Sequence, residues 1–152
     1  MEYTTFGRTG LRVSKLGLGG APLGGVFGPT DEREIEKMIH EAIDSGINFI
    51  DTAPSYGRGE SERRIGKALS SGRRNEVVLT SKAVGPGESF DYVNTIRSVE
   101  QSLERLQTDW IDLLQIHDVE QVPYETIINE TLPALEKLRE DGKIRYIGVS
   151  TR

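Results

Sequence analysis

The chain has 152 residues, of which 36% are hydrophobic and 28% are charged, and its formal net charge is −5 at pH 7. This composition is typical of a globular protein with one core, and it provides no electrostatic attraction to nucleic acid or to an anionic membrane. The chain contains no cysteine, which excludes disulfides and thiolate metal sites. No apolar stretch approaches the ~20 residues that a membrane-spanning helix requires.

The start of the chain lacks the basic and apolar regions of a secretory signal. Together with the absence of cysteine, this favours a cytoplasmic location. We expect a single domain over residues 1–152, with no metal, no nucleic-acid partner and no membrane attachment.

The first residues predict a hairpin and a short strand. Residues 3–15 alternate in polarity around a turn at residues 7–10, which is typical of a β-hairpin. A strand of small residues at 16–18 then leads into residues 19–28, which are rich in glycine. Such a segment indicates either a loop whose backbone something approaches closely or a flexible loop without a ligand.

Four later segments have apolar residues at the spacing of one buried helix face. Thr30 is predicted to cap the first helix and Ser89 the third, because their hydroxyls can accept hydrogen bonds from free N–H groups of a first helical turn. The second helix covers residues 61–70 and the fourth covers residues 124–140. Pro133 falls within the fourth pattern, so we expect a kink there or two shorter helices.

Short apolar strands alternate with these helices. Their ends recur every 30 to 36 residues, at Leu18, Ile50, Thr80, Ile116 and Val149. This spacing is the length of one strand–helix unit, and alternating units of this kind form a parallel sheet. The strands are almost continuously apolar, as expected for strands that are covered on both faces.

Two α/β architectures fit this order: an open doubly wound sheet and part of a (β/α)8 barrel. A doubly wound dinucleotide fold would carry the pattern G-x-G-x-x-G at the start of its first helix. Here Gly17 and Gly19 are followed by a long loop instead. The polar candidates follow successive strands, which is how barrel active sites are built at the C-terminal rim. We therefore predict a (β/α)8 barrel, of which this chain supplies the hairpin, about five strands and four helices.

Polar residues lie just beyond the predicted ends of three successive strands: Asp51, Tyr56, Lys82 and His117. Each has an ordinary structural explanation: a carboxylate that binds its own loop, a loop tyrosine, a solvated lysine, and a core imidazole paired with Asp118. The carboxyl ends of parallel strands meet at one rim, so we expect the four side chains to converge. Convergence favours a joint role in catalysis.

The four side chains together predict carbonyl chemistry. Tyrosine ordinarily ionises near pH 10, and a nearby ammonium such as that of Lys82 favours the phenolate, while Asp51 keeps that ammonium charged. Tyr56 can then exchange a proton with a substrate oxygen that His117 orients by a hydrogen bond. None of these groups supplies a hydride. The set therefore predicts either carbonyl–alcohol interconversion with a cofactor or an aldolase reaction through a Schiff base on Lys82.

The motif D-T-A-x-x-Y-G at residues 51–57, with Lys82 and His117 after later strands, resembles the aldo-keto reductase superfamily. The leading hairpin and the segment 142–150 resemble it as well. The glycine-rich segment at 20–28 is similar to that of the subgroup that contains L-galactose dehydrogenase and D-threo-aldose dehydrogenase.

The resemblance implies a (β/α)8 barrel that binds NADP or NAD in extended form and acts on a small-molecule carbonyl or sugar. It implies that Tyr56 is the general acid/base, that Lys82 and Asp51 tune it, and that His117 orients the carbonyl. The residues that it places beside the cofactor are Gly20, Ala21, Asp51 and Ser150.

The family's barrel has eight strands, whereas this chain carries five. We therefore expect either part of a longer oxidoreductase or a shortened chain that is inactive or binds a partner. The strand at 144–149 is predicted to have a free apolar edge, which is a template for pairing with another chain. We expect the isolated chain to self-associate through this edge.

Overall fold

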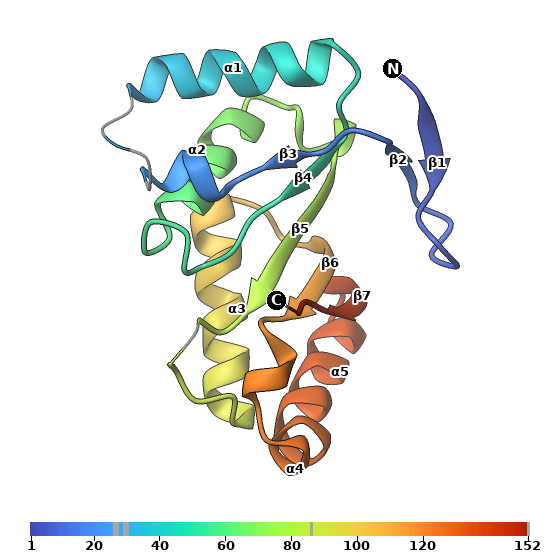
Figure 1. Cartoon of the computed structure of the whole chain (residues 1–152), viewed down its shortest axis with the longest axis vertical. Helices are drawn as coiled ribbons and strands as arrows, with labels where there is room; N and C mark the ends of the chain where they lie inside the picture. The colour runs from blue at the N-terminus through green and yellow to red at the C-terminus, as the bar shows by residue number, and fades with distance from the viewer. Residues whose placement is uncertain (26–27, 29–30, 86, 152) are drawn as a thin grey trace.

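A computed structural model describes residues 1–25, 28, 31–85 and 87–151. An antiparallel hairpin precedes a five-stranded parallel sheet whose strand order follows the sequence (Figure 1). The strands are β1, Tyr3–Thr5; β2, Arg12–Ser14; β3, Leu18–Gly19; β4, Phe49–Asp51; β5, Val78–Ala83; β6, Ile111–Ile116; and β7, Ile144–Val149. The predicted hairpin and the predicted succession of parallel strands are both confirmed.

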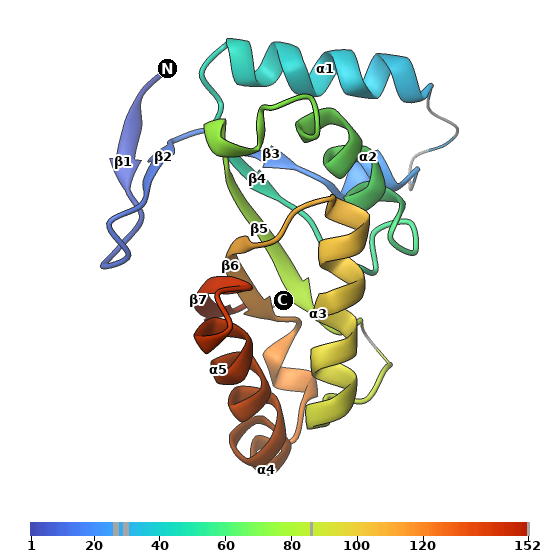
Figure 2. The ribbon, with the colours of Figure 1, turned by 180° about the vertical axis from the view of Figure 1, so that it is seen from behind.

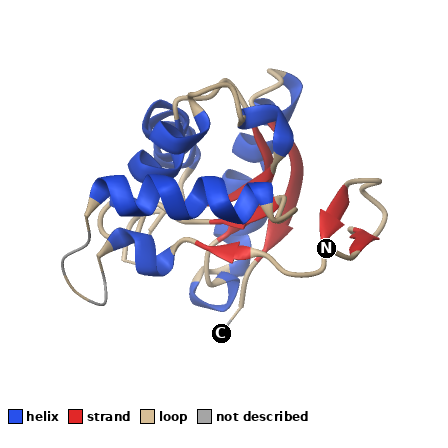
Figure 3. Cartoon of the chain, turned by 90° about the horizontal axis from the view of Figure 1, so that it is seen from above, coloured by secondary structure: helices blue, strands red, loops and turns tan. Residues whose placement is uncertain are grey.

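Helices connect the strands and gather on one side of the sheet (Figure 3). They are α1, Glu32–Asp44; α2, Glu60–Leu69; α3, Tyr92–Leu106; α4, Tyr124–Thr126; and α5, Leu132–Glu140. Shorter 3₁₀ segments are η1, Ala21–Gly24; η2, Arg74–Glu76; and η3, Val119–Gln121. Helices α3 and α5 lie side by side over the later strands (Figure 2).

The core lies between the sheet and the helical layer. Its fully buried members include Ile39 of α1, Ile65 of α2 and Leu135 of α5, together with Leu79 of β5 and Leu114 of β6. Burying each such side chain contributes roughly 1.5–3 kcal/mol, so this contact holds the strand ends in place.

The hairpin packs where the sheet strands begin (Figure 1). The Ser14 N–H donates to Asn48 Oδ1 at 2.6 Å, and the Asn48 N–H donates to Ser14 Oγ at 3.0 Å. The rings of Phe6 and Phe49 stack with their centroids 5.5 Å apart. These contacts leave the opposite end of the sheet, where the strands finish, clear of the hairpin.

Two predicted helix caps are wrong. Helix α1 is capped by Asp31, which accepts hydrogen bonds from two backbone N–H groups of the first turn, and Thr30 lies outside the described residues. Helix α3 is capped by Asp91, which accepts from the Asn94 N–H. Ser89 stands two residues earlier and donates its hydroxyl to Asp91. In both cases an aspartate close to the predicted residue takes the cap, because its charged oxygen is a stronger acceptor near the positive helix end.

The helix predicted at 124–140 is interrupted before Pro133. The π-helical segment η4, Ile127–Thr131, separates α4 from α5, and the Leu132 N–H donates to the carbonyl O of Ile127, five residues back. A proline lacks the N–H that would continue the α-helical ladder and crowds the carbonyl four residues earlier. The expected division into shorter helices is therefore confirmed.

Two strands lie at the edges of the described sheet, β3 and β7. Val149, at the end of β7, is exposed. The self-association expected through this edge stays a prediction. The loop predicted at 19–28 contains η1, and its residues 26 and 27 lie outside the described residues. Among the described residues, no helix combines the length and apolar character needed to cross a membrane.

Candidate active site

The register of the sheet brings the predicted residues to one rim. Asp51 pairs with Thr80 between β4 and β5, and Lys82 pairs with Gln115 between β5 and β6. Side chains alternate between the two faces of a strand, so Thr80 and Lys82 share a face. Ser81 points the other way, where its hydroxyl bonds α2. The rim residues therefore occupy the face turned away from the helices.

The ammonium group of Lys82 is fully used by three oxygens. Nζ donates to Asp51 Oδ1 at 2.8 Å, to Asp51 Oδ2 at 2.9 Å and to the carbonyl O of Thr52 at 2.9 Å. The lysine side chain is 6% exposed, whereas the aspartate side chain is 35% exposed. Lys82 was predicted just beyond a strand that ends at Thr80. It lies instead within β5, which continues to Ala83.

Tyr56 follows β4, and two glycines fix the loop that carries it. Gly57 has a φ of +63°, and a Cβ added there would lie 2.1 Å from the carbonyl O of Gly24. A Cβ on Gly24 would lie 2.6 Å from the backbone of Tyr56. The two segments therefore pack backbone against backbone, which requires glycine on both sides. This contact holds the tyrosine loop against η1.

The end of β3 is held close to the same loop. Ser61 Oγ donates to the carbonyl O of Gly20 at 2.7 Å and lies 2.8 Å from Thr52 Oγ1. The Gly20 N–H donates to the carbonyl O of Asp51 at 2.7 Å. A Cβ on Gly20 would lie 2.6 Å from Ser61 Oγ. At Gly20, the close approach predicted for the glycine-rich loop is therefore made by Ser61, Thr52 and Asp51 of the same chain.

An ion pair whose carboxylate is fully buried supports the rim from behind. Glu62 of α2 accepts from the Ser81 hydroxyl at 2.7 Å and from Arg105 Nε at 2.6 Å. It ties α2 to β5 and α3 directly beneath Lys82. The burial of this glutamate was not predicted, since a charged residue in the first turn of a helix is usually exposed.

His117 lies directly after β6 and is 8% exposed. Its ring meets the ring of Tyr56 edge-on, with centroids 6.4 Å apart, and Lys82 Nζ lies 5.3 Å from the Tyr56 ring centroid. Burial lowers the pKa of His117 below its ordinary value; the charge of Asp118 opposes this shift and the charge of Lys82 adds to it. The imidazole is therefore neutral at pH 7, and Nδ1 has no hydrogen-bond partner among the described residues.

Gln115 joins the site and was not predicted. Its Nε2 donates to Thr80 Oγ1 at 3.0 Å and to Asp51 Oδ1 at 3.3 Å. It lies two residues before His117, which directly follows the last residue of β6. An amide within an otherwise apolar strand end was the signal that could have identified it. The amide braces the carboxylate that holds Lys82.

The residues predicted to contact a cofactor lie at two separate places on the rim. Gly20 and Ala21 follow β3, whereas Ser150 follows β7, and these strands are the two edges of the described sheet. Asp51 lies between them, at the end of β4. Ser150 Oγ accepts from the Asp118 N–H at 3.1 Å, and a hydroxyl that accepts one bond can still donate another.

Two hollows adjoin the site. One, of about 650 Å³, extends from the hairpin along β3 to Asp51, and the other, of about 400 Å³, is lined by His117, Phe90 and Val122. A ligand could therefore approach the rim on either side. Chemically, Asp51 and the Thr52 carbonyl engage all three N–H groups of Lys82, which disfavours nucleophilic attack by Lys82 and leaves Tyr56 as the group placed for proton transfer.

Comparisons with known proteins agree on one family. The profile of the aldo/keto reductase family matches residues 15–152. The chain is 42% identical to L-galactose dehydrogenase of Arabidopsis thaliana over 154 residues, covering 99% of this chain and 48% of that protein. It is 44% identical to the aldo-keto reductase YhdN of Bacillus subtilis (strain 168) over 159 residues, covering 99% and 47%.

The structure is similar to those of proteins in the same family. It superposes on the aldo-keto reductase AKR11C1 from Bacillus halodurans, described as a holo form, with a TM-score of 0.84 and 36% identity, covering 99% of this chain and 50% of that one. The chain thus spans about half the length of the relatives that it matches.

Proposed function

This chain belongs to the aldo-keto reductase family, and we propose that the whole protein interconverts a carbonyl and an alcohol with NADP or NAD. The observation that carries the proposal is the Asp51–Lys82 ion pair beside the rings of Tyr56 and His117. Four side chains suited to moving and orienting a proton meet there on the open face of the sheet.

In the proposed reaction Tyr56 gives its phenolic proton to the carbonyl oxygen, or takes a proton from the alcohol in the reverse direction. The ammonium of Lys82 stabilises the negative charge that develops on the phenol oxygen. Asp51 and the Thr52 carbonyl hold that ammonium in place and leave it charged. Gln115 in turn holds Asp51, so the proton donor rests on a chain of fixed side chains.

Neutral His117 has a different task in this proposal. A neutral imidazole carries one N–H and can donate it to the substrate oxygen while its ring stands edge-on to Tyr56. Such a bond would orient the carbonyl without competing for the proton that Tyr56 transfers. The burial that keeps the ring uncharged is therefore useful at neutral pH.

In this proposal the rim offers a nicotinamide cofactor polar groups at separate places. The partly exposed Asp51 can accept a hydrogen bond at the end of β4, and the Ser150 hydroxyl can donate one after β7. Gly20 and Ala21 would approach the cofactor at the end of β3. When bound, the cofactor supplies the hydride that none of these side chains carries. The proposed cofactor is either NADP or NAD.

The proposed substrate is a small carbonyl compound or an aldose. The support is the likeness to a protein named L-galactose dehydrogenase, since its name specifies a sugar. The competing aldolase reaction would need Lys82 as a free amine, and the three bonds to its ammonium oppose that state. Borohydride trapping of a carbonyl compound on Lys82 would favour the aldolase.

The direct test is Tyr56→Phe in the whole protein, with turnover followed by nicotinamide absorbance. Loss of the proton donor should lower kcat by about 10²–10⁴-fold, the usual contribution of general acid–base catalysis. Cofactor binding, followed by fluorescence, should be retained. Tyr146→Phe is the matched control, because the Tyr146 hydroxyl donates to the carbonyl O of Thr9 in the hairpin, far from the rim. Full turnover in Tyr56→Phe would end the proposal.

A further inference from the structure

Strands β5 and β6 leave the sheet through residues with an unusual backbone. Val84, directly after β5, has a φ of +62°, and Asp118, two residues after β6, has a φ of +46°. Aspartate tolerates the left-handed region, but a β-branched side chain there is a genuine outlier. Val84 is also fully buried, so its backbone conformation is imposed by packing and hydrogen bonding.

The backbone N–H of each of these residues is held by a serine hydroxyl from another element. The Val84 N–H donates to Ser98 Oγ of α3 at 3.1 Å, and the Asp118 N–H donates to Ser150 Oγ after β7 at 3.1 Å. Ser98 is itself buried, on the face of α3 that packs against β5. A buried N–H without an acceptor is unfavourable, so the Ser98 hydroxyl removes one penalty that the left-handed turn would otherwise carry.

The turn at Val84 adjoins two groups of the proposed mechanism. Lys82 lies two residues before it on β5. Ala83 pairs with Ile116 in the β5–β6 register, so Val84 and His117 are the next residues of that row. The backbone of Val84 is also one of the groups that act on the His117 imidazole. A relaxation of Val84 would therefore displace the strand end that carries Lys82 and the chain beside His117.

We propose that Ser98 is a positioning residue, which holds Val84 in the left-handed conformation and so fixes Lys82 and His117 at the rim. The consequence for turnover rests on the proposed function, because that function assigns the roles of Lys82 and His117. The structural part of the inference is independent of the proposed function. It concerns the position of an imidazole that can be observed whether or not the chain turns over substrate.

The experiment uses Ser98→Ala and the proton NMR signals of the imidazole rings. The chain has only two histidines, so His40 of α1 is an internal reference for His117. In Ser98→Ala the ring signals of His117 should shift and its titration midpoint should rise towards the ordinary value, because a loosened rim admits water. The His40 signals should stay in place. Thr95→Val is the matched control: it removes another buried hydroxyl of α3, one that donates to the Phe90 carbonyl and not to a strand end.

A second variant separates positioning from mere packing. Glycine adopts positive φ without strain, so Val84→Gly should keep the turn without help from Ser98. Adding Ser98→Ala to Val84→Gly should then move the His117 signals much less than Ser98→Ala does alone. If Ser98→Ala does not fold, Val84→Gly/Ser98→Ala should fold, since the strain that the hydroxyl offsets is gone.

In the whole protein, Ser98→Ala should lower kcat about tenfold and leave the KM for the nicotinamide cofactor unchanged, and Ser98→Thr should restore most of the rate. Unmoved His117 signals in folded Ser98→Ala would overturn the inference. A shift on Ser98→Ala that is equally large with and without Val84→Gly would do the same. Absence of turnover in the unmodified protein would count against the proposed function and leave the NMR result standing.

Discussion

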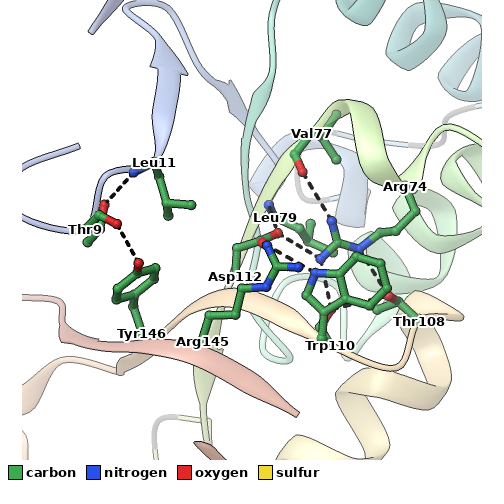
Figure 4. Close-up of polar contacts among 10 residues, drawn as sticks. All are labelled: Thr9, Leu11, Arg74, Val77, Leu79, Thr108, Trp110, Asp112, Arg145 and Tyr146. Carbon is green, nitrogen blue, oxygen red and sulfur yellow. Dashed lines mark hydrogen bonds and ion pairs between the residues drawn. The ribbon is translucent and has the colours of Figure 1, made fainter. Parts of the chain in front are cut away.

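Two aspartate clusters lie at opposite ends of the same sheet, and they are built differently. Asp51 ends β4 at the rim, whereas Asp112 is the second residue of β6, near the end where the strands begin (Figure 4). Asp112 accepts from Arg74 at 2.8 Å, from Arg145 at 2.9 Å and from the Leu79 N–H at 3.0 Å. Its side chain is 4% exposed.

The base cluster, which is Asp112 with Arg74, Arg145 and Trp110, encloses its carboxylate. The guanidinium carbons of Arg74 and Arg145 lie 4.3 Å and 5.3 Å from the centroid of the Trp110 ring, and the indole Nε1 donates to Asp112 Oδ1 (Figure 4). The rim pair, which is Asp51 with Lys82, has one cation, and its carboxylate is partly exposed. We infer that a fully paired acid serves stability, whereas an acid that stays partly exposed can serve chemistry.

The base cluster predicts the largest loss of stability. Arg74→Met removes the buried partner of Asp112 and also vacates bonds to the Val77 and Trp110 carbonyls. Removing one member of a buried ion pair costs about 3–5 kcal/mol, which denaturant unfolding can measure. Arg145→Met is the matched control: that side chain is 53% exposed, so the loss should stay below about 1 kcal/mol. Equal losses of stability in the two variants would show that burial does not decide how much each arginine contributes.

A second prediction tests how firmly the rim is held. Gly57→Ala forces a left-handed alanine, at about 1–2 kcal/mol, and drives its Cβ against the Gly24 carbonyl, at about 1–3 kcal/mol more. Gly10→Ala is the control, since Gly10 also has positive φ but a Cβ there would meet nothing within 4 Å. Unfolding experiments should show the larger loss for Gly57→Ala. Equal losses would mean that backbone contact does not hold the Tyr56 loop.

The smallest expected effect concerns pH. The folded-state pKa of His117 lies below its ordinary value of about 6.5, so the unfolded chain binds more protons between the two values. Stability should therefore be unaffected by this group above pH 6.5 and should fall as the pH drops from there towards the folded pKa. Each unit of difference in pKa contributes about 1.36 kcal/mol. His117→Gln should flatten that part of the stability profile. An unchanged pH dependence of stability in this variant would mean that a group other than His117 causes it.

Features that depend on the local sequence could be predicted. The positions of Asp51 and His117 at strand ends follow from apolar runs and the breaks after them. The end of β5 does not, because the strand continues past Thr80 through Ser81 and Lys82 to Ala83. Convergence at one rim follows from parallel strand order alone. The interruption before Pro133 could also be predicted, because it follows from a missing N–H on a known residue.

Features that depend on contacts between distant segments could not be predicted. The approach of Gly24 to Gly57 requires two loops to be placed in space, and nothing at either glycine indicates its partner. Gln115 is a single amide in a strand, whose role depends on its register with Lys82. The caps at Asp31 and Asp91 were not predicted for a different reason. Several residues with capping side chains stand close together there, and small differences in charge decide among them.

We infer that the rim pair serves chemistry and that the base cluster serves stability. The most direct test compares Asp51→Asn with Asp112→Asn, measuring the free energy of unfolding and the turnover of both variants in the whole protein. We predict that Asp112→Asn costs about 3–5 kcal/mol, because two guanidinium groups that cannot lose a proton remain beside it. Asp51→Asn should cost less stability, since Lys82 keeps its bond to the Thr52 carbonyl and water reaches the partly exposed side chain at position 51. It should lower kcat more than Asp112→Asn does. A larger stability loss at Asp51, or turnover more sensitive to Asp112, would contradict this account.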